Sequence, residues 1–250
     1  LMCLPLAKPA IPINLTEGDQ VLVARQNVFG FDLFRQLTND GGNVFISPTS
    51  IALALSMSYN GAQGQTKTTM AEALRIGDMT VGEVNNASRN IITFLNYPDR
   101  DVELLTANSI WAREGVAFKE EFLRAIQEGF GAEVGVLDPA DEAAETINRW
   151  VKRETRKMIP RIIDRVDPLQ VMFLVNAIYF KGEWTKPFDQ DLTKEEEFTL
   201  NDGSVKMCPM MRMREAQELR YLETPDFEAI ELPYGESGRL GMYLFLPREM

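Results

Sequence analysis

Apolar residues recur at helical spacing over much of the chain before Pro160. Such spacing gathers them on one face of a helix, where they can be buried together. Helices are therefore predicted at residues 20–37, 66–74, 81–95 and 141–158, with a further helix through Phe118, Phe122 and Ile126 that stops at Gly129. Turn-forming runs such as Asn-Asp-Gly-Gly at 39–42 support these boundaries.

Short runs of apolar or alternating residues predict strands, and these dominate the second half of the chain. The predicted strands are residues 44–46, 102–112, 132–137, 171–180, 194–200, 204–213, 218–222, 227–232 and 240–246. Both faces of segment 102–112 are largely apolar, so we expect it to be covered on both sides. Because helices gather in the first half of the chain and strands in the second, the pattern indicates an α+β fold.

The stretch that begins at Asn43 has no charged residue between Val44 and Thr66. Ser47 is predicted to cap a helix with its side-chain oxygen, and Pro48 suits the first helical position. Residues 51–57 are apolar nearly all round, so we expect the helix to be packed on all sides. A membrane span is the alternative, but the many hydroxyl groups of this stretch favour a buried helix.

Asn176 is the one strongly polar residue in the apolar run 171–180. An unpaired amide inside a protein costs about 1–3 kcal/mol, so Asn176 is expected to have hydrogen-bond partners. It can be an ordinary satisfied core amide or a polar latch between neighbouring strands. The residues alone leave both readings open.

The composition of the chain limits the classes of protein and of partner that fit it. The chain has 250 residues, 45% hydrophobic and 25% charged, as expected of one large or two small globular domains. Its net charge of −11 disfavours nucleic acid or an anionic membrane as the main partner, because both attract clustered Lys and Arg. The two cysteines, Cys3 and Cys208, are too few for a disulfide framework.

Catalytic chemistry is not indicated by any motif. The chain lacks histidine, which excludes Ser-His-Asp and Cys-His catalysis and histidine-based metal sites within it. It also lacks a glycine-rich phosphate or dinucleotide loop, a G-x-S-x-G turn and a Cys/His cluster with metal spacing. We therefore predict no catalytic residue, no cofactor and no metal, and a protein that is not an enzyme.

Several segments resemble the serpin family, in serpin order and spacing. The pattern N-V-F-I-S-P-x-S-I-x-x-A-L-x-M-x-x-x-G-A-x-G-x-T from Asn43 resembles the helix B to helix C signature. Other segments resemble the second strand of sheet A (106–111), helix F (147–159), the third strand of sheet A with its exit (175–188) and sheet B (232–234 and 244–247).

The resemblance implies the serpin fold, with helices A–F and parts of sheets A, B and C. The serpin domain is expected over residues 20–250, after an extended arm at 1–19 that is predicted from its prolines. The implied function is that of a protease inhibitor, which traps a serine or sometimes a cysteine protease by inserting its cleaved reactive loop into sheet A. A non-inhibitory carrier, storage protein or chaperone is the alternative. The family mostly acts outside the cell or in the cell envelope, although intracellular members exist.

The same resemblance assigns roles to individual residues. Ser47, Ser50 and Asn176 match the shutter, under the centre of sheet A where strands part, and Ser47 and Ser50 are expected to meet Asn176. Trp184 matches the breach, where the loop enters, and helix F at 141–158 has to yield during insertion. Family members continue beyond the position of Met250, so we expect the fifth strand of sheet A, the hinge, the reactive loop and its scissile bond to lie in a C-terminal remainder.

Overall fold

The computed structural model describes residues 14–96, 100–137, 142–167, 170–200 and 202–248. Cys3 and residues 1–13 of the predicted arm lie outside these ranges. The described residues divide into two compact units, one within residues 14–96 and 104–180 and the other within residues 100–103 and 181–248. Each unit is described by itself.

The first unit holds all the predicted helices. They are α1 (Glu17–Leu37), α2 (Pro48–Gly61), α3 (Gly64–Ala73), α4 (Val81–Leu95), α5 (Glu120–Phe130) and α6 (Ala143–Glu154), with a single 3₁₀ turn at Thr38–Asp40. α1 begins three residues before the predicted start, because Thr16 and Asp19 form a capping box. α6 ends before the predicted residue 158, because Arg156 and Lys157 adopt left-handed backbone angles.

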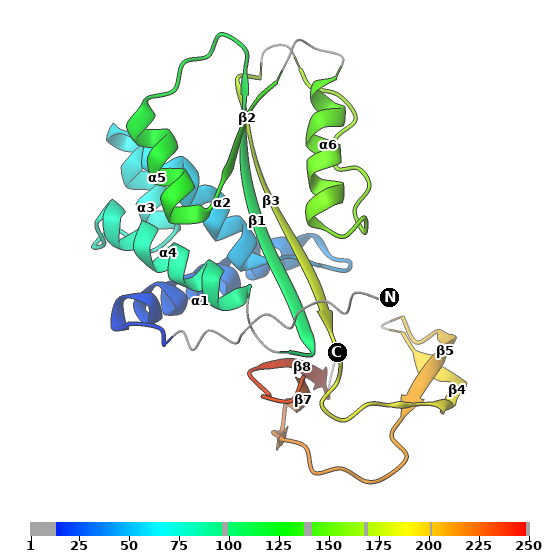
Figure 1. The fold of residues 1–250 in the computed structure, drawn as a ribbon. Coiled ribbons are helices and arrows are strands. Elements are labelled where there is room, and N and C mark those ends of the chain that lie inside the picture. The colour runs from blue at the N-terminus through cyan, green and yellow to red at the C-terminus, as the bar shows by residue number, and fades with distance from the viewer. Residues whose placement is uncertain (1–13, 97–99, 138–141, 168–169, 201, 249–250) are drawn as a thin grey trace. The chain divides into compact units, whose positions relative to one another are not determined.

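Three strands form the sheet of this unit: β1 (Val102–Arg113), β2 (Glu133–Leu137) and β3 (Met172–Gly182), in the order β2-β1-β3 (Figure 1). The first two residues of β1 and the last two of β3 are assigned to the other unit. β1 and β2 are parallel, with Ser109 opposite Glu133. β1 and β3 run antiparallel, since the amide of Arg113 near the end of β1 donates to the carbonyl of Val171, just before β3, at 3.0 Å. All three strands were predicted.

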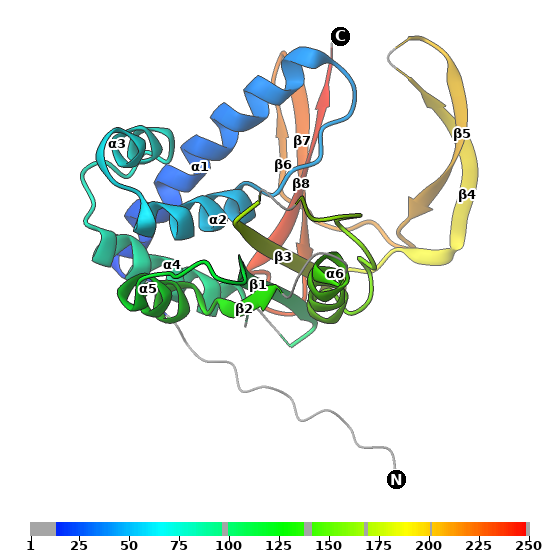
Figure 2. The same ribbon diagram turned by 90° about the horizontal axis from the view of Figure 1, so that it is seen from above.

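Helices cover both faces of this sheet. α6 lies on one face, and α2, α4 and α5 lie on the other (Figures 1 and 2). On the α6 side, Trp111 of β1 joins a buried cluster with Ile147 and Trp150. On the opposite side, Ile110 of β1 joins a cluster with Leu53 of α2 and residues of α5. The prediction that β1 is covered on both faces is confirmed.

Two expectations for the stretch around α2 are wrong. Residues 44–46 do not form a strand, and Phe45 is fully exposed. A strand forms only with a partner, and the described strands pair in sheets that do not include this segment. α2 buries Ala52, Leu53 and Met57 but leaves Leu55 37% exposed, so it is not packed on all sides. Among the described residues, no helix is long and apolar enough to cross a membrane.

The second unit is built from strands, as predicted. β4 (Asp189–Thr199) and β5 (Val205–Arg212) form a hairpin, and Gly203 in its turn has a positive φ of 80°. β6 (Tyr221–Glu223), β7 (Phe227–Tyr234) and β8 (Leu240–Pro247) form an antiparallel sheet in that order.

Candidate functional site

A chain of side-chain hydrogen bonds crosses the sheet of the first unit beneath α2. The hydroxyl of Ser50, in the first turn of α2, donates to Oδ1 of Asn176 on β3. Nδ2 of Asn176 donates to Oδ1 of Asn108 on β1 at 2.7 Å. Nδ2 of Asn108 then donates to the backbone carbonyl of Phe130, at the end of α5, at 2.9 Å. One polar chain thus joins two helices and two neighbouring strands.

Strand geometry explains why the two amides meet. Side chains alternate between the faces of a strand, and Val175 and Ala177 pack into the α6 cluster. Asn176 between them therefore points to the opposite face. Asn108 lies on the same face of β1 as Ile110, which packs on the α2 side. Antiparallel pairing of the two strands then brings both amides to one place.

Because these groups are buried or half-buried, breaking the hydrogen bonds between them costs free energy. Asn108 is only 2% exposed, and Ser50 and Asn176 are half-buried next to apolar side chains. The groups that these hydrogen bonds join are a hydroxyl, two amides and a carbonyl, so none changes its charge near neutral pH. The hydrogen bonds that join Ser50, Asn176, Asn108 and Phe130, called the polar junction below, therefore form a fixed contact and not a proton-transfer site. Among the described residues, no group of His, Cys, Asp and Glu side chains could hold a metal ion.

Ser47 does not join this junction. It occupies the predicted N-cap position of α2, but its side chain makes no capping hydrogen bond, so that part of the prediction is wrong. Ser47 is exposed, so water can satisfy its hydroxyl and the free amides of the first turn in place of the cap. Among the described contacts, the structure brings Ser50 to Asn176 and not Ser47. The shutter role of Ser47 stays a prediction.

Asn108 is the member of the junction that was missed. The sequence shows it on one face of a strand that is apolar on both sides, which was a usable signal, because a buried amide requires a partner. The identity of that partner depends on how β1 and β3 align, and the sequence does not specify this alignment.

Trp184 lies in the second unit, where aromatic neighbours hold it. Its ring stacks on that of Tyr234 with centroids 4.3 Å apart and an angle of 15° between the planes. Phe188 meets it edge-on at 6.1 Å. The amide of Thr185 donates to the carbonyl of Pro233 at 3.0 Å. Burial raises the pKa of the Tyr234 hydroxyl, so this cluster remains uncharged. The breach role of Trp184 stays a prediction.

Comparisons with known proteins identify the fold. The model of the family described as serpin (serine protease inhibitor) matches residues 24–250. An uncharacterized serpin-like protein of Thermococcus kodakarensis is 36% identical over 94% of this chain and 55% of its own length. Leukocyte elastase inhibitor of Bos taurus is 35% identical over 92% of this chain and 62% of its own length.

Solved structures agree with these relatives. The structure of ovalbumin from emu superposes with a TM-score of 0.85 at 30% identity, over 92% of this chain and 64% of that chain. The chain thus spans about three fifths of the length of the proteins that it matches. Family model, relatives and structure agree that the chain belongs to the serpin family.

Proposed function

We propose that this protein inhibits serine proteases, and in some cases cysteine proteases, by the serpin mechanism. The protease would cleave an exposed reactive loop and remain attached as an acyl-enzyme while the loop inserts as a new strand beside β3. The serpin supplies neither nucleophile nor base, which agrees with a chain that lacks histidine. The similarity to an elastase inhibitor of cattle supports an inhibitory role.

The open edge of β3 is the observation that supports this proposal best. β3 lies at one end of the strand order β2-β1-β3 among the described residues. An edge strand presents unpaired N–H and C=O groups, to which another strand can add. Yet residues 172–180 are apolar apart from Asn176, which is typical of a strand inside a sheet and not of a solvent-facing edge.

The polar junction would oppose unwanted opening of the sheet. Parting β3 from β1 breaks the bond between Asn176 and Asn108, and moving α2 breaks the bond to Ser50. Each buried polar group left without a partner costs about 1–3 kcal/mol. This cost would keep the sheet closed until the energy released by strand insertion exceeds it.

The reactive loop is the other part of the proposal. The relatives are longer than this chain, and we propose that the hinge, the loop and the fifth strand of the sheet correspond to their unmatched part. The partners would be a target serine protease and this C-terminal remainder of the same serpin. We propose a place outside the cell or in the cell envelope, which fractionation of the source cells would test.

Incubation of the full-length protein with a panel of serine proteases tests the inhibitory function. The expected product is a complex of serpin and protease that survives SDS, because the acyl bond is covalent. A protease whose active-site serine is changed to alanine is the control and should give no such complex. Cleavage of the serpin by every protease, without any stable complex, would exclude inhibition.

A non-inhibitory serpin that acts as a carrier, storage protein or chaperone is the alternative. The similar solved structure from emu is named as an ovalbumin and not as an inhibitor, which supports this alternative. The hinge before the reactive loop discriminates between the two. Small residues there would permit rapid insertion, whereas bulky, charged or proline residues would hinder it and favour the alternative.

A further inference from the structure

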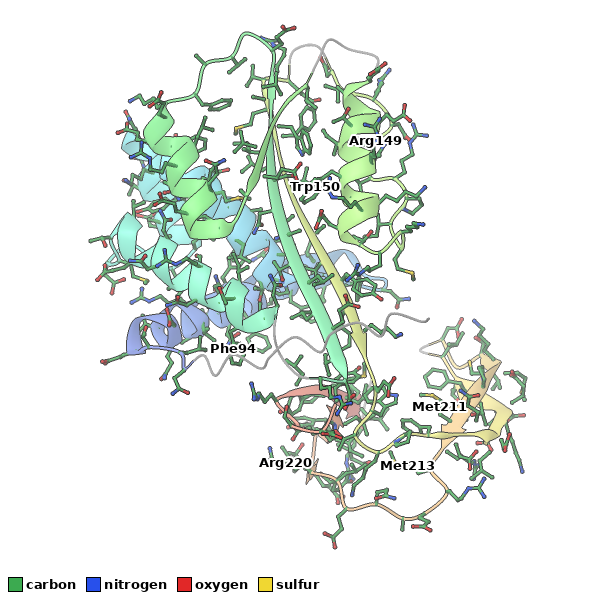
Figure 3. The ribbon with its side chains drawn as sticks, viewed as in Figure 1. Phe94, Arg149, Trp150, Met211, Met213 and Arg220 are labelled. Carbon is green, nitrogen blue, oxygen red and sulfur yellow. The ribbon has the colours of Figure 1, made fainter. Side chains whose placement is uncertain are left out.

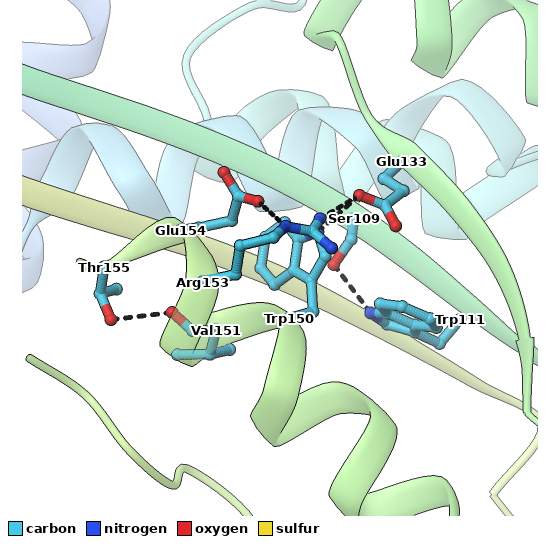
Figure 4. Close-up of polar contacts among 8 residues, drawn as sticks. All are labelled: Ser109, Trp111, Glu133, Trp150, Val151, Arg153, Glu154 and Thr155. Atoms are coloured by element: carbon cyan, nitrogen blue, oxygen red, sulfur yellow. Dashed lines mark hydrogen bonds and ion pairs between the residues drawn. The ribbon is translucent and has the colours of Figure 1, made fainter. Parts of the chain in front are cut away.

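One carboxylate on β2 receives two hydrogen bonds from α6. The indole Nε1 of Trp150 donates to Oε2 of Glu133 at 3.0 Å, and the guanidinium of Arg153 donates to the same oxygen at 2.5 Å (Figure 4). Arg153 also donates to Glu154 at 2.7 Å. A hydrogen bond that involves a charged group is about twice as strong as a neutral one. Glu133 therefore ties α6 to the edge strand of the sheet.

Trp150 is the side chain through which α6 is anchored. It points from α6 towards the sheet and is only 2% exposed (Figure 3). Its ring meets that of Trp111 on β1 edge-on, with centroids 6.4 Å apart. Trp111 is itself held by a hydrogen bond of 2.8 Å to Ser109 and by close contact with Gly135. Moving α6 would leave the buried indole N–H of Trp150 without its acceptor.

α6 also covers β3, the strand with the open edge. Val175 and Ala177 of β3 belong to the same buried cluster as Ile147 and Trp150 of α6. A strand that added to the edge of β3 would project every second side chain onto the face on which α6 lies. The ease with which α6 lifts from the sheet would then limit the rate of insertion.

We infer that Glu133 is a positioning residue that holds α6 on the sheet and thereby sets the rate at which the reactive loop inserts. The second half of this statement rests on the proposed inhibitory function. The first half, the tether between β2 and α6, stands on the contacts of Glu133 alone.

Glu133→Gln is the variant that tests the tether. An amide oxygen can still accept one bond, but the negative charge that holds Arg153 is lost. We expect the amides of α6 to exchange with deuterium about two- to fivefold faster than in the wild type, while those of α4 do not change. Trp150→Phe keeps an aromatic side chain but removes the N–H donor and part of the buried ring, and it should shift α6 in the same direction.

The chain offers a matched control. Glu196 on β4 accepts from Arg212 at 2.5 Å, and the side chains of this pair are 37% and 56% exposed. The pair of Glu133 and Arg153 has the same distance and exposures of 49% and 58%. Glu196→Gln removes the same kind of ion pair within the second unit, to which α6 does not belong, so it should leave exchange in α6 unchanged.

The rate of complex formation with a target protease tests the second half. Full-length Glu133→Gln should form the SDS-stable complex about two- to fivefold faster than the wild type, and Glu196→Gln should match the wild type. Unchanged exchange in α6 of both Glu133→Gln and Trp150→Phe would overturn the tether. Faster exchange with an unchanged rate of trapping would overturn its link to insertion. A wild type that forms no complex, together with faster exchange in the variants, would refute the proposed function and still support the tether.

Discussion

Asn176→Ala is the substitution that tests the polar junction most directly. It removes the donor to Asn108 and the acceptor of Ser50 in a single step. Asn108 is 2% exposed, and a buried polar group without a partner costs about 1–3 kcal/mol, with less expected at half-buried Ser50. We therefore expect the free energy of unfolding to fall by about 2–4 kcal/mol, and Tm by about 2–4 °C for each kcal/mol.

Urea unfolding followed by circular dichroism measures this loss. A double-mutant cycle between Ser50→Ala and Asn176→Ala should give a coupling of about 0.5–3 kcal/mol, because the two side chains are in direct contact. The matched control is the cycle between Ser47→Ala and Asn176→Ala, which should show no coupling beyond about 0.5 kcal/mol. A loss below about 0.5 kcal/mol for Asn176→Ala, or equal coupling from Ser47 and Ser50, would refute the junction.

Two further substitutions probe other parts of the first unit. In Gly135→Ala the new Cβ would lie 2.4 Å from the ring of Trp111, so thermal unfolding should show a loss of about 3 kcal/mol, whereas Gly82→Ala, with open space around it, should lose none. A hydrogen bond from Arg25 lowers the pKa of Asp78 below its ordinary value of 3.8, so the stability that this pair adds is lost as the pH falls through the lowered pKa. Asp78→Asn should therefore weaken the fall in stability below about pH 4, and an unaltered acid limb in urea titrations would contradict this.

Local signals were enough to predict the helices. In α4 the apolar side chains Val84, Ala87 and Ile91 recur at helical spacing, and Thr80 and Glu83 form a capping box at its start. All these interactions join residues within a few positions of each other. The hydrogen bonds inside a helix join residues four apart, so the pattern that specifies it can be read locally even though packing of its apolar face stabilises it. The observed limits of α4, Val81 and Leu95, match the predicted ones.

The segment 44–46 shows where local signals fail. Its sequence Val-Phe-Ile favours a strand, but a strand exists only if a second strand lies beside it. Among the described residues none does, and Phe45 is fully exposed in place of buried. The apolar pattern thus reports that a segment suits a sheet, and it does not report which strand will pair with it.

Predicting the polar junction requires both the local pattern along each strand and the packing of segments that are distant in sequence. Alternation along each strand follows from sequence, so the faces of Asn108 and Asn176 were predictable separately. Their contact depends on the register of β1 against β3. A slip of one residue in that register would turn one of the two amides to the opposite face of the sheet. The same limit separates Ser50 from Ser47, since only the way α2 approaches the sheet decides which hydroxyl reaches Asn176. A buried amide in an apolar strand therefore predicts that a partner exists, and the packing of distant segments determines which one it is.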